Sequence, residues 1–151
     1  MHLTAAAIQA LEGEHKTHFL NPQAQRHNVS LGDAVGLKNL GVHKISVEPG
    51  CYSTELHYHH YEEECLYVLS GQAQLTLGEE TRNVGPGDFI GCPLNGVAHA
   101  LYNNGQEPLV CLVIGQRLEQ DISDYPRLGQ RLYRHSGHWD LVEQQALKKI
   151  K

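Results

Sequence analysis

Residues 66–78 read LYVLSGQAQLTLG and contain two short apolar runs separated by a Ser-Gly pair. The first run is continuous, whereas in the second run Ala73, Leu75 and Leu77 alternate with polar residues. Alternation with a period of two places successive side chains on opposite faces of a strand, and Ser and Gly are typical of turns between strands. This stretch therefore predicts two β-strands joined by a tight connection.

The same texture extends on both sides of this stretch, from residue 41 to residue 115. Each short run of alternating residues ends at Gly, Pro or Asn, which is the pattern of an all-β sandwich or barrel. No long helical pattern interrupts the runs, and this disfavours a parallel α/β architecture.

The 151 residues form one structural domain in this prediction. We expect an N-terminal arm over residues 1–40 that packs on the barrel, a barrel core over residues 41–115 and a C-terminal arm over residues 116–151. Periodicity is weak before residue 41, and the chain is polar after residue 115. Both arms are therefore expected to be short and either helical or irregular.

Charge and hydropathy disfavour several classes of protein. The chain has 12 Lys and Arg against 17 Asp and Glu, and no run of basic residues is longer than two, so no nucleic-acid partner is expected. The longest strongly apolar stretch, Leu109–Ile114, is far shorter than a membrane span. No export signal is readable, and the four cysteines form no CxxC pair. We therefore expect a cytoplasmic protein with reduced thiols.

The candidate functional residues lie around a His-x-His pattern. His57 and His59 share strand parity, so both imidazoles point to one side. Glu64 begins the next predicted strand and reaches them if the intervening loop reverses direction, with Glu62 and Glu63 as alternatives. His99 shares parity with an apolar residue and is expected to face the interior, where an imidazole needs a partner. Histidine and carboxylate together form a ligand set for a divalent first-row metal.

These two segments resemble the paired motifs of the cupin superfamily. The first motif is His-x-His, four residues, Glu, six residues and Gly, and the second matches at Gly87, Pro93, Gly96, His99 and Asn103. The spacing departs by one residue after Gly50 and by one between Pro93 and Gly96, both within loops. The resemblance implies a double-stranded β-helix, or jelly-roll, barrel. It also implies one metal ion, held by His57, His59, Glu64 and His99.

The resemblance also sets the functional expectations. Four protein ligands leave two positions on an octahedral Zn, Mn, Fe, Ni or Co ion, which is room for an oxygen-rich small-molecule substrate. Residues 121–134 are similar to the tails of small cupins called sugar phosphate isomerase-like or oxalate-binding-like. We expect a metal-dependent enzyme that acts on a sugar derivative or an organic acid, such as an isomerase or epimerase, with Glu63 or Tyr102 transferring protons. The alternatives are a ferrous-iron dioxygenase and a non-catalytic binding or sensing protein.

Two further expectations concern charge and assembly. A phosphorylated substrate requires cations in the barrel mouth, yet the strand candidates Lys44, Arg82 and Arg117 are few. The C-terminal arm, with Arg127, Arg131 and Arg134, is the remaining source. We also expect a homodimer, because a small jelly roll exposes sheet edges and an apolar outer face.

Overall fold

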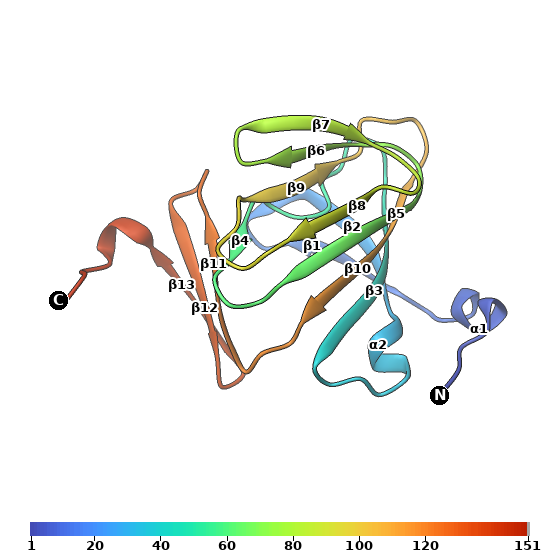
Figure 1. Ribbon diagram of the computed structural model, residues 1–151, viewed down its shortest axis with the longest axis horizontal. Helices are drawn as coiled ribbons and strands as arrows, with labels where there is room; N and C mark the ends of the chain where they lie inside the picture. The colour runs from blue at the N-terminus through green and yellow to red at the C-terminus, as the bar shows by residue number, and fades with distance from the viewer. Residues whose placement is uncertain (151) are drawn as a thin grey trace.

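The computed structural model describes residues 1–150, and its regular secondary structure is almost entirely β-strand (Figure 1). The largest sheet contains β1 (Glu14–His18), β2 (Asn21–Ser30), β3 (Leu40–Val47), β5 (Glu64–Ser70), β8 (Phe89–Cys92) and β10 (Leu109–Gln116). Their order in the sheet is β1-β2-β3-β10-β5-β8, with all neighbours antiparallel. A second sheet has the order β7-β6-β9, with β6 (Ala73–Leu77), β7 (Glu80–Val84) and β9 (His99–Tyr102). The predicted all-β jelly-roll fold is confirmed.

The hydrophobic core lies between these two sheets. Buried residues of β3, β5, β8 and β10 pack there against Ala73 and Leu75 of β6 and Leu101 of β9. Strand β10 is central in the large sheet, and its buried Cys111 lies opposite Ile45 on β3 and Val68 on β5. The alternation in the sequence thus marks which side chains face the core.

The turn between β5 and β6 requires glycine. Gly71 has a φ of +82°, and a Cβ at this position would lie 2.5 Å from the carbonyl oxygen of Pro108. Both the left-handed backbone and the close approach exclude a larger residue. The glycine in the predicted tight connection therefore has a direct structural reason.

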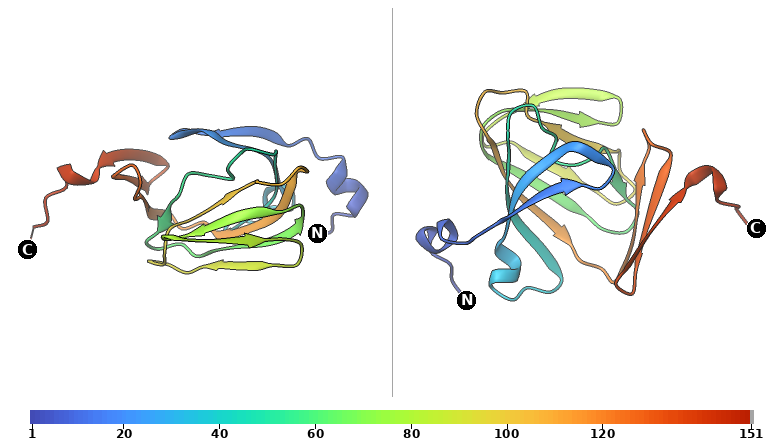
Figure 2. Two further views of the ribbon diagram at one scale, coloured as in Figure 1. Left: turned by 90° about the horizontal axis from the view of Figure 1, so that it is seen from above. Right: turned by 180° about the vertical axis from the view of Figure 1, so that it is seen from behind.

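The N-terminal segment differs from the expected arm. It has a five-residue helix, α1 (Ala5–Gln9), capped by Thr4, and a one-turn helix, α2 (Leu31–Ala34). Between the helices, β1 and β2 form a hairpin that pairs with β3 and so extends the large sheet (Figure 2). Both strands are rich in polar residues. The sequence therefore shows no apolar alternation from which these strands could be predicted.

The C-terminal segment is also built from strands rather than from helix or irregular chain. Its sheet has the order β13-β12-β11-β4, with β4 (Tyr58–His59), β11 (Gln120–Tyr125), β12 (Gln130–His135) and β13 (His138–Glu143). A single 3-10 turn, η1 (Gln144–Ala146), follows it. This sheet lies at one end of the barrel and includes β4, which lies between β3 and β5 in the chain (Figures 1 and 2).

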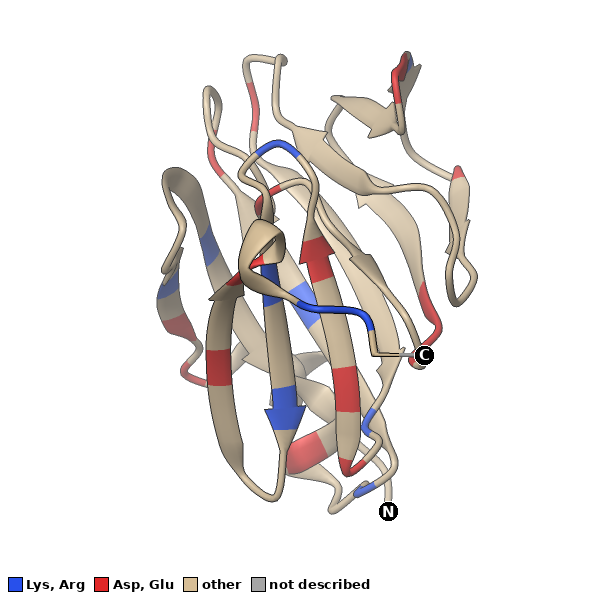
Figure 3. Ribbon diagram, turned by 90° about the vertical axis from the view of Figure 1, so that its left-hand side faces the viewer, with Lys and Arg blue, Asp and Glu red and all other residues tan. Residues whose placement is uncertain are grey.

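Charged residues are distributed over the surface with both signs close together. Figure 3 shows basic and acidic positions interspersed on the face at the C-terminal side. Several form local ion pairs, such as Arg82 with Glu80 at 2.6 Å. Within residues 1–150, none of the helices has the length and apolar character needed to cross a membrane.

Candidate functional site

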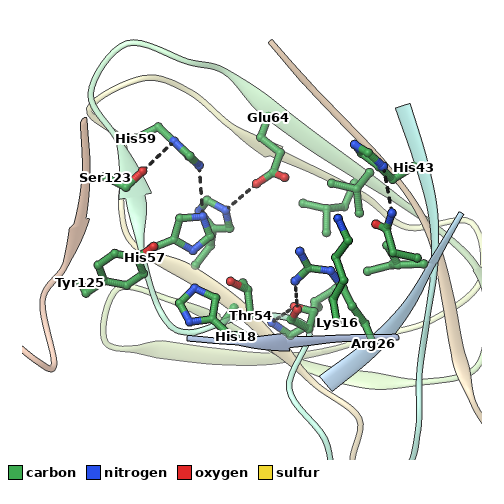
Figure 4. A pocket seen from close by; sticks show the side chains of 18 of the residues that line it. Lys16, His18, Arg26, His43, Thr54, His57, His59, Glu64, Ser123 and Tyr125 are labelled. Atoms are coloured by element: carbon green, nitrogen blue, oxygen red, sulfur yellow. Dashed lines mark hydrogen bonds and ion pairs between the residues drawn. The ribbon is translucent and has the colours of Figure 1, made fainter. Parts of the chain in front are cut away.

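A cavity of about 440 Å³ lies in the barrel and is lined by side chains from all three sheets. This volume is in the range of about 300–1,000 Å³ that is usual for small-molecule sites. Its inner part is apolar, with Ile45, Leu66, Leu75 and Leu101. Polar side chains gather at two places on its wall, the first around His57 and the second around Arg26 (Figure 4).

The first polar group contains all four predicted metal ligands, His57, His59, Glu64 and His99, which we call the ligand cluster. The Nε2 atoms of His57 and His59 are 3.1 Å apart, and Nε2 of His99 is 3.1 Å from Oε2 of Glu64. Ligand atoms of His57, Glu64 and His99 all lie within 4.8 Å of one another. The structure therefore brings together on one cavity wall residues from two motifs that are 35 positions apart in the chain.

Strand pairing places these residues. His57 and His99 form an antiparallel bridge, with backbone hydrogen bonds of 3.3 and 2.8 Å in the two directions. His59 lies on β4, and Glu64 is the first residue of β5. Because His57 and His99 face each other across a bridge, their side chains lie on the same side of the sheet.

The donor set fits a divalent ion. Nδ1 of His57 donates to the carbonyl oxygen of Glu55 at 2.9 Å, and Nδ1 of His59 donates to Oδ2 of Asp121 at 2.5 Å. With these protons on Nδ1, the two Nε2 atoms present lone pairs to each other across 3.1 Å. Two facing lone pairs repel unless a proton or a cation lies between them. The tautomers assigned by the hydrogen bonds thus suit an ion at this point.

Charge in the ligand cluster is set by burial and by neighbouring groups. Burial lowers the pKa of His57 to about 3, so its imidazole is neutral. Burial alone would raise the pKa of Glu64, but the hydrogen bond to His99 and the nearby imidazoles lower it to about 2. The neutral imidazole of His57 and the ionised carboxylate of Glu64 are forms that bind metals. Burial alone would lower the pKa of His59, but the hydrogen bond to Asp121 and the nearby carboxylates raise it.

Asp121 holds His59 in position. It comes from β11, it is 3% exposed, and its Oδ1 accepts the backbone N–H groups of Tyr61 and Glu62. His59, Glu62 and Asp121 also lie close enough to hold an ion together. However, Oε1 of Glu62 already accepts from the backbone of Leu118 and pairs with Arg134. We therefore assign Asp121 the orienting role that carboxylates often have beside a metal-binding histidine.

A second buried carboxylate fastens β4 to the C-terminal sheet. Asp124 accepts hydrogen bonds from Tyr58 at 2.7 Å and from Arg131 at 2.6 and 2.7 Å, and His60 lies at 3.0 Å. Burial alone would raise the pKa of Asp124, but Arg131 and Tyr58 hold it well below its ordinary value. His60 is therefore part of this structural network.

The structure does not bring the two predicted proton-transfer residues to the cavity. Glu63 is exposed, while its neighbours Glu62 and Glu64 face inward. Tyr102 packs on Tyr52, with ring centroids 4.6 Å apart, and neither ring lines the cavity. Glu63 is adjacent in the chain to the inward-facing Glu64, and Tyr102 is adjacent to the inward-facing Leu101, so each side chain points away from the side that its neighbour faces.

The cavity instead contains polar residues from the two arms that the sequence did not single out. Tyr125, from β11, is 4% exposed and stacks on His57 at 6.0 Å, and His18 of β1 lies 5.5 Å from Tyr125. Burial raises the pKa of Tyr125 to about 12, and burial followed by the charge of Arg26 lowers that of His18 to about 4. Both side chains are therefore neutral near pH 7. Two sequence signals could have identified these residues. His18 lies in a polar strand, and Tyr125 follows Asp121 and Asp124 in β11.

Comparisons with known proteins identify a family and two similar solved structures. A family model described as "Cupin domain" matches residues 43–115. A solved structure from Acidithiobacillus ferrooxidans, provisionally named a sugar phosphate isomerase, is 54% identical with a TM-score of 0.97, and the match covers 99% of this chain and 96% of that one. A second, named sugar phosphate isomerase from a cupin superfamily, from Silicibacter pomeroyi, is 25% identical with a TM-score of 0.84, covering 97% and 94%.

Curated sequences give a partial match to longer enzymes. The chain is 40% identical over 136 residues to "Mannose-1-phosphate guanylyltransferase 2" of Escherichia coli O157:H7, which covers 85% of this chain and 26% of that protein. It therefore spans about a quarter of the length of the curated relatives that it matches. Similarity to these enzymes concerns one part of their chains.

Proposed function

The chain belongs to the cupin superfamily, and we propose that it is a metal-dependent enzyme acting on an oxygen-rich small molecule derived from a sugar. The observation that carries this proposal is the meeting of His57, His59, Glu64 and His99 on the wall of a cavity of ligand size. We propose that these four residues hold one divalent ion among Zn, Mn, Fe, Ni and Co. The names of the two solved relatives support isomerisation or epimerisation as the reaction.

A divalent ion bound there supplies Lewis acidity to a carbonyl or hydroxyl oxygen of the substrate. The residues of this chain orient the substrate around it. Nδ1 of His18 accepts from the backbone of Leu20 at 3.2 Å, so the proton of the neutral ring is on Nε2. His18 Nε2–H and the protonated Oη of Tyr125 are then two neutral donors for substrate oxygens.

The roles predicted for Glu63 and Tyr102 stay predictions, and neither residue lines the cavity. We propose that Tyr125 donates the proton to a developing oxyanion, because its Oη is protonated and its side chain lies against His57. Substitution of Tyr125 by Phe is then expected to lower kcat with little change in the amount of bound metal.

Metal analysis followed by a substrate screen tests the proposed function. Purified protein is analysed for metal content, reloaded with each candidate ion and incubated with sugars, sugar phosphates and sugar acids in D2O. Isomerisation or epimerisation is followed by NMR as product formation and deuterium incorporation. His99→Gln is expected to lose both metal and turnover. His135→Gln, an exposed histidine paired with Asp140 at 2.7 Å, serves as the matched control and retains both.

The same screen separates the alternatives. Oxygen uptake that depends on ferrous iron identifies a dioxygenase and contradicts the isomerase proposal. Ligand-dependent thermal stabilisation without turnover with any metal identifies a binding or sensing protein.

We also propose a cytoplasmic homodimer. The four cysteines are all free, which suits a reducing compartment. On the outer face of the large sheet, Tyr67 and Phe89 lie opposite each other and are 43% and 68% exposed, next to Leu69 at 41%. This apolar face supports association with a second copy. Light scattering tests it, and a monomer at micromolar concentration contradicts it.

A further inference from the structure

Two cations from the N-terminal hairpin lie across the cavity from the ligand cluster. Lys16 of β1 and Arg26 of β2 line this part of the wall, which we call the cationic wall, together with Asn28 and His43 (Figure 4). The ligand cluster and the cationic wall belong to one cavity, which apolar side chains such as Leu66 and Leu75 also line. A ligand that fills the cavity meets both.

Arg26 differs from most arginines of the chain because it has no carboxylate partner. Ion pairs in the described residues join Arg82, Arg117, Arg131 and Arg134 to Glu80, Asp33, Asp124 and Glu62. Over residues 1–150, Arg26 makes one side-chain hydrogen bond, from Nη1 to the carbonyl oxygen of Ser53. Since a guanidinium has five N–H donors, most of those on Arg26 remain free.

Arg26 is half-buried, and burial lowers its pKa from the ordinary value. A cation removed from water without a counter-ion is destabilising. Arg127, the other arginine without an ion pair in the described part of the chain, is exposed and avoids this cost. The chain thus retains a costly charge on the cavity wall, and such a charge is typical of a binding group.

Glu64 is the nearest candidate for an internal counter-ion. Its charge raises the pKa of Arg26, but no ion pair within 4.0 Å joins the two residues. Its carboxylate lies instead beside His99 and within the ligand cluster. When Glu64 neutralises a bound metal cation, its negative charge offsets the positive charge of Arg26 even less.

The other groups of the cationic wall are paired with an acid or are neutral. Lys16 pairs with Glu14 at 2.7 Å on the partly exposed side of β1. Burial and the nearby cations, Arg117 foremost, lower the pKa of His43, and its ring lies 3.3 Å from the amide of Asn28. Asn28 and neutral His43 therefore offer hydrogen bonds without adding an acid that would repel an anion.

We propose that Arg26 binds an anionic group of the substrate, a phosphate or a carboxylate, while the sugar portion extends to the ligand cluster. A planar guanidinium matches the paired oxygens of both anions. Arg26 thereby selects anionic sugar derivatives over neutral sugars. This inference rests on the proposed function for the identity of the group that reaches the metal.

Binding of three related probes tests the inference on metal-loaded protein. Glucose 6-phosphate, glucuronate and glucose carry a phosphate, a carboxylate and no charge, and their dissociation constants are measured by calorimetry. Charge-assisted hydrogen bonds contribute about 1.5–3 kcal/mol, or roughly 10- to 100-fold in affinity. Arg26→Gln is expected to weaken binding of the preferred anionic probe by that factor and to leave glucose binding unchanged. The stronger of the two anionic probes identifies the group.

Two further variants keep the test decisive. Arg26→Lys retains the charge without the planar fork and is expected to give an intermediate affinity. Arg127→Gln removes an exposed cation and is expected to change no dissociation constant. Circular dichroism and metal content confirm that each variant is folded and loaded. Equal anion affinity in wild type and folded Arg26→Gln overturns the inference, as does the absence of anion binding in wild type.

Failure of the proposed function has a different signature. If anion binding depends on Arg26 but no turnover occurs with any metal, the anion site stands and the proposed enzymatic activity does not. If turnover depends on the ligand cluster but not on Arg26, the opposite conclusion holds.

Discussion

At the ligand cluster, Nδ1 of His57 and Nδ1 of His59 are each held by an oxygen of the chain, whereas Arg26 on the cationic wall has one backbone partner. The ligand cluster is therefore oriented before anything binds, and its free atoms point at one another. The cationic wall carries charge that the chain leaves uncompensated. The cavity therefore has oriented metal-ligand side chains at one end and an uncompensated positive charge, which favours an anion, at the other.

The largest expected effect breaks the ligand cluster itself. Glu64→Gln removes the only carboxylate among the four proposed ligands with almost no change in shape. We expect metal affinity to fall by more than about 100-fold. Substitution of residues that only hydrogen-bond to a metal ligand typically lowers the affinity by about 10- to 100-fold, and loss of a ligand is expected to exceed this range. Competition with a chromophoric chelator measures it.

Glu63→Gln is the matched control, since the same chemical change falls on the exposed neighbour. Its metal affinity is expected to equal that of wild type. Equal loss in both variants would contradict the assignment of Glu64. Loss of turnover in Glu63→Gln with metal retained would support the catalytic role predicted for Glu63.

The next effect concerns the orientation of His59. Asp121→Asn replaces the carboxylate that accepts from Nδ1 of His59 at 2.5 Å, and we expect a 10- to 100-fold lower metal affinity, the usual range for such partners. The same competition assay measures the change. Asp140→Asn, which alters an exposed partner of His135, is the control. Wild-type affinity in Asp121→Asn would show that Ser123, 3.2 Å from the same atom, is sufficient.

A smaller effect is expected in the pH dependence of stability. The pKa of His18 falls from 6.5 to about 4 through burial and the charge of Arg26, so between these pH values the unfolded chain binds more protons. Stability therefore falls as the pH falls from 6.5 to 4. His18→Gln removes this contribution, which we expect to be on the order of 1–3 kcal/mol.

Urea unfolding of metal-free protein at pH 7 and at pH 4.5 measures it. His138→Gln, an exposed histidine on β13, should leave the pH dependence as in wild type. An unchanged slope in His18→Gln would show that this imidazole is not desolvated in the folded protein.

The smallest effect is expected at an exposed ion pair near the base of the large sheet. Asp33 accepts from Arg117 and Ser30, which lowers the pKa of its carboxyl, but the Asp33 side chain is 56% exposed. Asp33→Asn should therefore lower the free energy of unfolding by less than about 1 kcal/mol, and the difference should shrink in high salt. A loss that is larger and insensitive to salt would indicate a structural role beyond the pair.

The ligand cluster was predictable because its signals are local. Strand parity puts His57 with His59 and turns His99 inward, and the motif spacing adds Glu64. The same parity also argues against Glu63 and Tyr102, since each alternates with an inward residue, Glu64 or Leu101. Their selection as catalytic residues followed chemical type and not the direction of the side chain.

The cationic wall could not be read from the sequence for a different reason. Lys16, His18, Arg26 and Asn28 are polar residues that line the cavity, so β1 and β2 lack the apolar alternation that identifies a strand. Among the expected phosphate-binding cations, only Arg134 lines the cavity, and it is paired with Glu62. Asp121 is 62 positions from His59, so its role depends on the tertiary fold alone.

The pairing of β4 with β11 has a consequence for protein engineering. Because Ser123 lies opposite His59 in this register, the backbone that carries one proposed ligand is an edge strand of the C-terminal sheet. A chimera that joined residues 43–115 to the tail of another cupin would keep the barrel but inherit a differently aimed imidazole. The segment matched by the family model is thus not an interchangeable module, and exchange of tails offers a way to retune the metal without altering any residue that binds it.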